Sequence, residues 1–333
     1  MSATGASIAS RLFGEGPALL GGGRAYAAAR RETQVAIVLG PNQYGKAENR
    51  VVRIYRDTGR HEIRDVNVST ALRGDFEDAH LTGDQSRILP TDTQKQTVFA
   101  FAKTIGIGEI EDFALALGRH FVHDVEPVTG CRIEIDEYAW ERVSVHGQEH
   151  DHTWMRSGQE TRTTILIIEG EDGAEHLVSG LKDLMLLKST GSEFHDFLVD
   201  EYTTLLPTTD RIMATSLVAR WRYLGTDIDW AAAYASIRQL LLEQYAEVHS
   251  LALQQTLYEM GRAVLKAHDE VAEVKFSAPN KHHIAYDLSP FGLENLNEVF
   301  HASDRPYGLI QATVQRDDAP PPGSAWDTIP GFC

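Results

Sequence analysis

A chain of 333 residues is longer than one hydrophobic core usually serves, so the sequence favours two domains or one structural unit used twice. Hydrophobic residues make up 42% of it, and no apolar run approaches the ~20 residues of a membrane-spanning helix, which predicts a soluble protein with no membrane partner. The formal net charge of -17, with scattered lysines and arginines, argues against a nucleic-acid partner, because phosphate backbones would be repelled.

The first half of the chain reads as strands followed by two helices. Residues 1–32 form an N-terminal extension that is rich in Ala, Gly and Arg and carries no clear signal peptide. Strands are predicted next in TQVAIVLG, which begins at Thr33, and in NRVVRIYRD and HEIRDVNVST. Two helices follow, in DTQKQTVFAFAKTIG and GEIEDFALALGRHFV. In the second, Ile110, Phe113, Ala114 and Leu117 keep the i, i+3, i+4, i+7 spacing of an amphipathic helix.

Strand alternation returns in CRIEIDEYAWERVSV and then changes parity. Ile133 and Ile135 lie on one face of the expected strand, whereas Tyr138 and Trp140 fall on the other, which indicates a β-bulge. The polar stretch from about 146 to 156 that follows is expected to be a loop.

The second half repeats the order of the first. Strands are predicted in TRTTILIIEG, HLVSGLKDLMLLKS and ATSLVARWRYL, and helices in DWAAAYASIRQLLLEQYAEV and LQQTLYEMGRAVLKAH. Closing strands are expected in EVAEVKFSA and GLIQATV. The order strands, helix pair, strands therefore occurs twice, which predicts a duplicated α+β unit with antiparallel sheets. We place the units at 33–152 and 153–315, with a C-terminal arm at 316–333 that begins ahead of three consecutive prolines.

Motifs of the common enzyme classes are missing from the sequence: it holds no dinucleotide fingerprint, nucleophile elbow or HExxH pair. The group His146, Glu149, His150 and His152 has an HxH spacing that a metal site could use. Its polar, turn-like surroundings favour solvated side chains instead, and we expect no metal. Two cysteines, Cys131 and Cys333, exclude a disulfide scaffold and indicate a reducing compartment.

Four segments carry a resemblance to a known family. They are LLKSTGSEFHDFLVDEYTTLLPTTDR at 186–211, QYGKAENRV at 43–51, LPTDTQKQT at 89–97 and SAPNKHH at 277–283. Together they resemble the urate oxidase (uricase) family, and the first matches that family's signature. The similarity extends from about Thr33 to about Val314.

The resemblance implies a fold and an assembly. Each half of the chain would be a tunnelling-fold (T-fold) domain, an antiparallel sheet with helices packed on one side. Two such domains in tandem would assemble as a barrel-like homotetramer, with active sites shared between subunits. The doubled α+β order read from the sequence agrees with this expectation.

The resemblance also implies the residues that hold the substrate. Phe194 would stack on a planar purine, while the Arg211 guanidinium would grip its anionic edge through two parallel hydrogen bonds. Gln254 would pair with the far edge of the purine, and Leu253 would bind through its backbone N–H. Outside a family match, core packing for Phe194 and a surface ion pair for Arg211 would be the ordinary readings. The neighbouring Gln255 leaves the register of the glutamine open by one residue.

Proton transfer would fall to other segments. Lys46 and Thr91 match the family's catalytic pair, which would reach in from a neighbouring subunit. Asp92 would contact the substrate beside them. Outside a family match, Thr91 would ordinarily be interpreted as a helix cap. Asn280 and His282 match residues above the purine plane, where oxygen or water binds and His282 relays protons. His283 is adjacent and has the same side chain, so His282 is assigned this role by its match to the family motif and not by its chemistry.

The implied reaction is the oxidation of urate by O2 and water, without cofactor, to 5-hydroxyisourate and hydrogen peroxide. The alternatives are another T-fold enzyme acting on a pterin or purine, some of which need zinc, and a non-catalytic purine-binding protein. The chain ends in Gly-Phe-Cys and not in the peroxisomal address Ser-Lys-Leu, which favours a bacterial, cytoplasmic enzyme.

Overall fold

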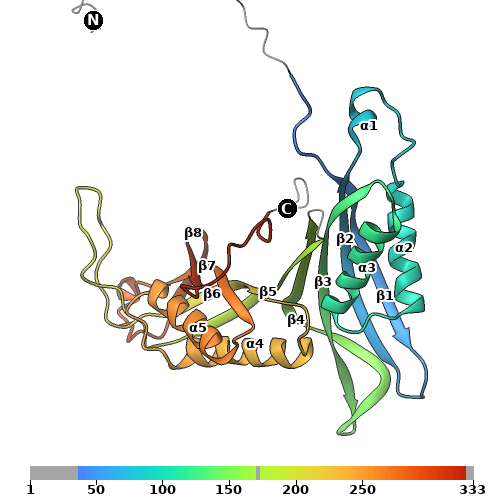
Figure 1. Ribbon diagram of the computed structural model, residues 1–333. Coiled ribbons are helices and arrows are strands. Elements are labelled where there is room, and N and C mark those ends of the chain that lie inside the picture. Colours follow the sequence, from blue (N-terminus) through green and yellow to red (C-terminus); the bar gives the residue numbers. More distant parts are fainter. Residues whose placement is uncertain (1–36, 170–172, 328–333) are drawn as a thin grey trace, which may run out of the picture. The chain divides into compact units, whose positions relative to one another are not determined.

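The computed structural model describes residues 37–169 and 173–327, so residues 1–32 and Cys333 lie outside the described residues (Figure 1). The chain divides into the units Met1–Val38 and Leu39–Cys333, and the described helices and strands all belong to the second unit. No helix in the described part is both long enough and apolar enough to cross a membrane.

The same order of elements occurs twice in the second unit. Its first half contains β1 (Tyr44–Tyr55), β2 (Glu62–Gly74), α1 (Glu77–Leu81), α2 (Thr91–Thr104), α3 (Ile110–Asp124), β3 (Val128–Val145) and β4 (Gln148–Glu169). Its second half contains β5 (Ala174–Lys188), β6 (Met213–Tyr223), α4 (Trp230–Glu247), α5 (Leu253–Ala267), β7 (Val271–Ala285), the 3-10 turn η1 (Ser289–Phe291) and β8 (Phe300–Gln315). Each half therefore places a helix pair between two pairs of strands, as the duplicated α+β unit predicts.

All eight strands belong to one antiparallel sheet in the order β1 to β8. The halves meet where β4 pairs with β5, from Thr161 opposite Lys182 to Glu169 opposite Ala174. β4 is continuous through residues 152 and 153, where the sequence analysis placed the boundary between the two units. Helices α2 and α3 lie along the first strands and α4 and α5 along the later ones (Figure 1).

The two faces of the sheet carry different cores. Alternate side chains of a strand point to opposite faces, and in β4 Leu166 and Ile168 contact the core that includes all four long helices. Ile165 and Ile167 contact a small second cluster on the other face with Ala325 of the C-terminal arm. The arm is attached to this face, because Trp326 donates from Nε1 to Glu273 at 3.1 Å.

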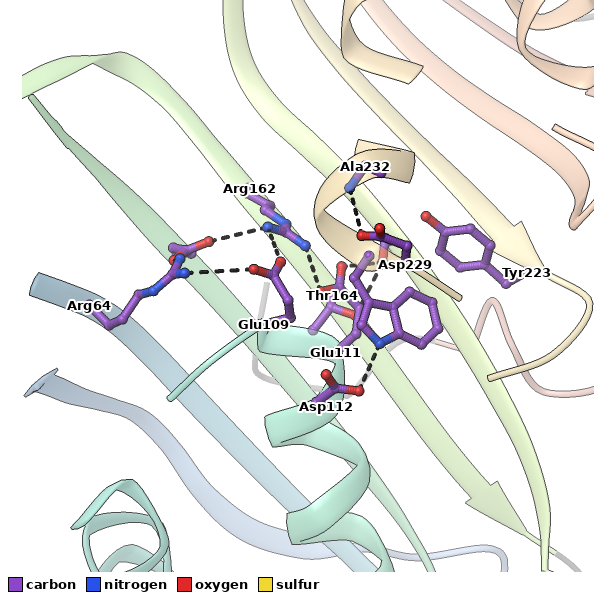
Figure 2. Close-up of polar contacts among 12 residues, drawn as sticks. Arg64, Glu109, Glu111, Asp112, Arg162, Thr164, Tyr223, Asp229 and Ala232 are labelled. Carbon is purple, nitrogen blue, oxygen red and sulfur yellow. Dashed lines mark hydrogen bonds and ion pairs between the residues drawn. The ribbon is translucent and has the colours of Figure 1, made fainter. Parts of the chain in front are cut away.

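A buried network of charges joins the two helix pairs (Figure 2). The Arg162 guanidinium on β4 binds Glu109 at 2.8 Å and Glu111 at 2.7 Å, and Glu111 is only 1% exposed. Burial raises the pKa of Glu111, and the Arg162 charge opposes that rise. Trp230, the first residue of α4, donates from Nε1 to Asp112 of α3 at 2.8 Å and so links the halves directly.

Several elements match the sequence predictions and two do not. The helices expected around 92–106 and 108–122 are α2 and α3, those expected around 229–248 and 253–268 are α4 and α5, and the bulge appears as a register shift between Tyr138 and Trp140. The expected loop at 146–156 is wrong: a two-residue turn with positive φ at His146 and Gly147 leads directly into β4. The run TQVAIVLG is also not a strand over its described residues 37–40, since β1 begins only at Tyr44.

Candidate functional site

A cavity of about 830 Å3 lies in the second half of the chain, a size typical of ligand pockets, which span roughly 300–1,000 Å3. Six of the residues expected to act on the substrate line it. They are Phe194, Arg211, Leu253, Gln254, Asn280 and His282. The cavity thus brings together residues from three parts of the chain, namely the connection between β5 and β6, the start of α5, and β7.

Phe194 and Arg211 come from opposite ends of the long connection between β5 and β6. Short backbone pairings hold this connection in place: Phe194 and Thr208 exchange two N–H···O bonds of 2.8 Å, and the Arg211 N–H donates to the Ser192 carbonyl at 2.9 Å. The guanidinium carbon of Arg211 therefore lies 5.2 Å from the centre of the Phe194 ring. Phe197 stacks on the Phe194 ring, with 4.9 Å between centroids, and supports it.

Arg211 is a half-buried cation without a counter-ion among the described residues. Its Nε donates to the Ser192 hydroxyl at 3.2 Å, and neither terminal nitrogen has a hydrogen-bond acceptor in the described part of the chain. Removal from water lowers the pKa of Arg211 relative to its ordinary value. A guanidinium that keeps its charge after partial desolvation favours an anion in the adjoining space.

The neighbouring Asp210 does not supply that anion. Its two carboxylate oxygens accept hydrogen bonds from Thr190 at 2.8 Å and Asn297 at 3.2 Å. Asn297 is itself part of the cavity wall, as are Phe300 and Ile310 further along the chain. The sequence analysis did not identify Asn297, Phe300 or Ile310. The one indication in the sequence was Asp210, which adjoins Arg211 and binds Asn297 in the folded chain.

Helix α5 places the two glutamines in different surroundings. Gln255 accepts a hydrogen bond from the Leu251 N–H at 3.0 Å and so serves the first turn of its own helix. Gln254 is exposed and lines the cavity, and Leu253, the first residue of α5, lies beside it. Of the two glutamines, Gln254 is therefore the one that lines the cavity.

Strand β7 supplies Asn280 and both neighbouring histidines. Asn280 pairs with Thr215 on β6 and with Gly308 on β8, and the β7–β8 register shifts immediately after it. Because of this irregularity, His282 and His283 both reach the cavity wall. Both imidazole rings are therefore available to a molecule in the cavity.

Lys46, Thr91 and Asp92 lie together in the first half of the chain and are not among the residues that line this cavity. Lys46 is on β1, and Thr91 and Asp92 open α2 after Pro90, so the N-cap of α2 is Pro90 and not Thr91. The hydrogen bond from Lys95 and then its charge lower the pKa of Asp92, and the charge of Lys46 makes a smaller contribution in the same direction.

Buried polar contacts fix β1 to the start of α2. The Lys46 N–H donates to the Thr70 hydroxyl at 3.3 Å, and that hydroxyl donates to Gln94 at 2.8 Å. Gln94 and Thr70 are fully buried. The two groups of candidate residues are thus each well ordered, one in each half of the chain.

The histidine group of the β3–β4 hairpin was the other candidate for chemistry. The rings of His150 and His152 meet edge to face with 4.5 Å between centroids, and His150 accepts a hydrogen bond from the His152 N–H through Nδ1 at 3.3 Å. Over residues 37–169 and 173–327, no three His, Cys, Asp or Glu side chains form a group that could hold a metal ion.

Comparison with known proteins gives a consistent result. A family profile described as Uricase matches residues 42–167 and 177–311. A uricase from Arthrobacter globiformis is 53% identical over 307 residues, covering 92% of this chain and 99% of that protein. A uricase from Cyberlindnera jadinii is 35% identical and covers 85% and 99%. The crystal structure of the Arthrobacter globiformis uricase superposes with a TM-score of 0.84 at 52% identity and covers 88% of this chain and all of that one.

Proposed function

Because this chain belongs to the uricase family, we propose that it oxidises urate with O2 and water to 5-hydroxyisourate and hydrogen peroxide. The observation that carries the proposal is the cavity, where an aromatic ring, a cation with no counter-ion in the described part of the chain and an amide from α5 surround one space. A flat anionic heterocycle with polar edges fits that combination of groups.

Phe194 and Arg211 hold the substrate in this proposal. The Phe194 ring, backed by Phe197, offers its face to the purine plane, and the terminal nitrogens of Arg211 bind the anionic edge. Gln254 and the Leu253 N–H bind the opposite edge, since an amide side chain can donate and accept at the same time. These contacts fix the orientation of urate before any chemistry occurs.

Lys46, Thr91 and His282 transfer protons. The Lys46 amine and the Thr91 hydroxyl withdraw a proton from bound urate, Asp92 contacts the substrate beside them, and His282 relays protons to solvent. The resulting electron-rich ring passes two electrons to O2, which leaves as hydrogen peroxide after taking up two protons. A water molecule held by Asn280 then adds at C5, so the urate ring gains one oxygen atom. The substrate supplies the electrons, so the reaction needs no metal or flavin.

A homotetramer with shared sites completes the proposal. In the described part of the chain β1 and β8 form the two edges of the sheet, and they carry exposed apolar side chains such as Val52 and Leu309. Long open edges favour pairing with another chain, and such pairing would close a barrel. A second copy would then bring its Lys46, Thr91 and Asp92 to the cavity of the first.

The test of the activity uses purified protein treated with a chelator. The decrease of urate absorbance, oxygen uptake and peroxide formation are followed together, and one O2 consumed per urate is expected. Urate that stays unchanged, or urate consumption that needs added zinc, would contradict the proposal.

Sharing of sites is tested by mixing two inactive chains. Co-expression of Arg211→Ala with Lys46→Ala should restore activity, because about a quarter of the sites between randomly mixed subunits would contain neither defect. Co-expression of Arg211→Ala with Asn280→Ala is the control, since both defects lie on the same side of the site and no recovery is expected. Absence of recovery in the first mixture would show that each site belongs to one chain.

We also propose that the protein works in the cytoplasm, a reducing compartment. The support is the low cysteine content: the chain has two cysteines, and one of them, Cys131, is buried in the core. Detection of the protein in a cytosolic fraction tests this proposal.

A further inference from the structure

A charged cluster lies behind the cavity wall and has no role in the proposed chemistry. The Glu193 carboxylate sits between two imidazoles, 2.7 Å from His195 Nε2 and 2.5 Å from His249 Nε2. The Glu193 side chain is 18% exposed, whereas His195 and His249 are more open. One carboxylate thus joins two segments that are 56 residues apart in the sequence.

The backbone places this cluster on the reverse side of the wall. The Glu193 N–H donates to the Ser250 carbonyl at 2.8 Å, and the Ser250 N–H donates to the Gly191 carbonyl at 2.9 Å. In such an extended pairing, neighbouring side chains point to opposite sides. Phe194 faces the cavity, so Glu193 and His195 on either side of it face away, toward His249.

The two joined segments each carry part of the substrate site. One continues from Glu193 into Phe194, and the other runs from His249 into α5 with Leu253 and Gln254. We propose that Glu193 is a positioning residue, which ties these segments through His249, is itself held in place by His195 on its own segment, and so sets the separation between the aromatic wall and the glutamine wall. The inference rests on the proposed oxidation of urate in this cavity.

The charges around the cluster make its strength depend on pH. Asp196 contacts His195 Nδ1 at 2.7 Å, and Lys188 of β5 lies close by with its amine bound to the Val248 carbonyl at 2.7 Å. Glu247, at the end of α4, borders the same surface as His249. Hydrogen bonds from His249 and then His195 lower the pKa of Glu193, while Glu193 and then Asp196 raise the pKa of His195.

The direction of the pH effect follows from the raised pKa of His195. The ion pair with protonated His195 is fully present below the ordinary histidine pKa and is lost as the pH rises through the raised value. Tight positioning should therefore be strongest at mildly acidic pH and weaken toward alkaline pH.

The test measures urate binding without oxygen, so that affinity is separated from turnover. Near pH 6, Glu193→Gln should raise the urate dissociation constant and KM by roughly two- to fivefold and change kcat by less than about twofold. Near pH 9, the ratio of the dissociation constants of variant and wild type should approach one. His249→Ala should raise the urate dissociation constant by a similar factor near pH 6, whereas His249→Gln, which keeps an N–H donor, should recover most of the affinity. Glu259→Gln on α5, where Glu259 pairs with Arg262 on the same helix, is the matched control.

The outcomes separate the two proposals. If wild-type protein neither binds nor oxidises urate, the proposed function fails. If wild-type protein does both, and Glu193→Gln and His249→Ala bind urate like wild type at every pH, the positioning role is wrong. A loss of affinity of equal size at all pH values would also contradict it, because a purely structural defect has no reason to follow the titration of His195.

Discussion

The structure predicts that Arg211 supplies most of the electrostatic attraction for the substrate. Its guanidinium is half-buried, lies 5.2 Å from the Phe194 ring centre and has no carboxylate partner among the described residues. Only Nε is engaged, with Ser192 at 3.2 Å. The two terminal nitrogens are therefore available for two parallel bonds to an anion.

The expected loss in Arg211→Ala follows from these contacts. A hydrogen bond to a charged group contributes about 1.5–3 kcal/mol, and two such bonds would give about 3–6 kcal/mol before any correction. Partial exposure of the arginine and access of water to the vacated space reduce this to about 2–4 kcal/mol, or roughly 30- to 1,000-fold in the dissociation constant. Arg211→Lys keeps the charge but not the planar fork, so it should recover only part of the affinity.

Binding is measured by titration with urate in the absence of oxygen, and KM and kcat are measured in air. Arg262→Ala is the control, because Arg262 is an exposed arginine that pairs with Glu259 on the surface of α5. The control should bind urate like wild type. An Arg211→Ala protein whose urate affinity stays within about threefold of wild type, a difference of only about 0.6 kcal/mol, would refute the reasoning.

Three further predictions concern the first half of the chain and the core. Lys46→Ala and Thr91→Ala should lower kcat by about 10²- to 10⁴-fold while anaerobic urate binding is kept, and near-normal turnover in both would exclude proton transfer by this pair. Gly45→Ala should lower both kcat and the urea concentration at the midpoint of unfolding. An added Cβ would lie 1.7 Å from the Thr70 carbonyl oxygen, so β1, with Lys46, would have to move away from β2. An unchanged midpoint would contradict this packing. Burial raises the pKa of Cys131 to about 12. In a variant whose other cysteine is replaced by serine, a thiol reagent should therefore not react near pH 8 until urea unfolds the protein. Fast labelling of the native state would show that the core is open.

The sequence predicted the repeated order of elements because that order depends on local patterns. The apolar stripe of α3 and the alternation in β2 and β3 are readable from neighbouring residues alone. The hairpin at 146–156 was misread as a loop because its side chains are mostly exposed on both faces, so no apolar period marks the strand. The apolar run at 37–40 was misread for the opposite reason, since apolar character without a pairing partner does not make a strand.

The candidate site residues were predicted one by one, and their arrangement was not. Family resemblance selected Phe194, Arg211, Gln254 and Asn280, but only the pairings around Ser192 and the register of β7 show that they surround one cavity. The different surroundings of Gln254 and Gln255 likewise became visible only through the cavity and the hydrogen bond from Leu251. Such contacts join residues far apart in the chain, and no short-range period encodes them.

The sequence by itself determined the kinds of element, their doubled order and the chemical groups available to a substrate. The tertiary structure alone decided that eight strands form one sheet, that the arm packs through Ala325 on its second face, and that Glu193 ties two segments of the cavity wall together. The physical reason is that local patterns depend on side chains a few residues apart. Sheet register and shared cavities instead depend on backbone hydrogen bonds and packing between segments that meet only when the whole chain has folded.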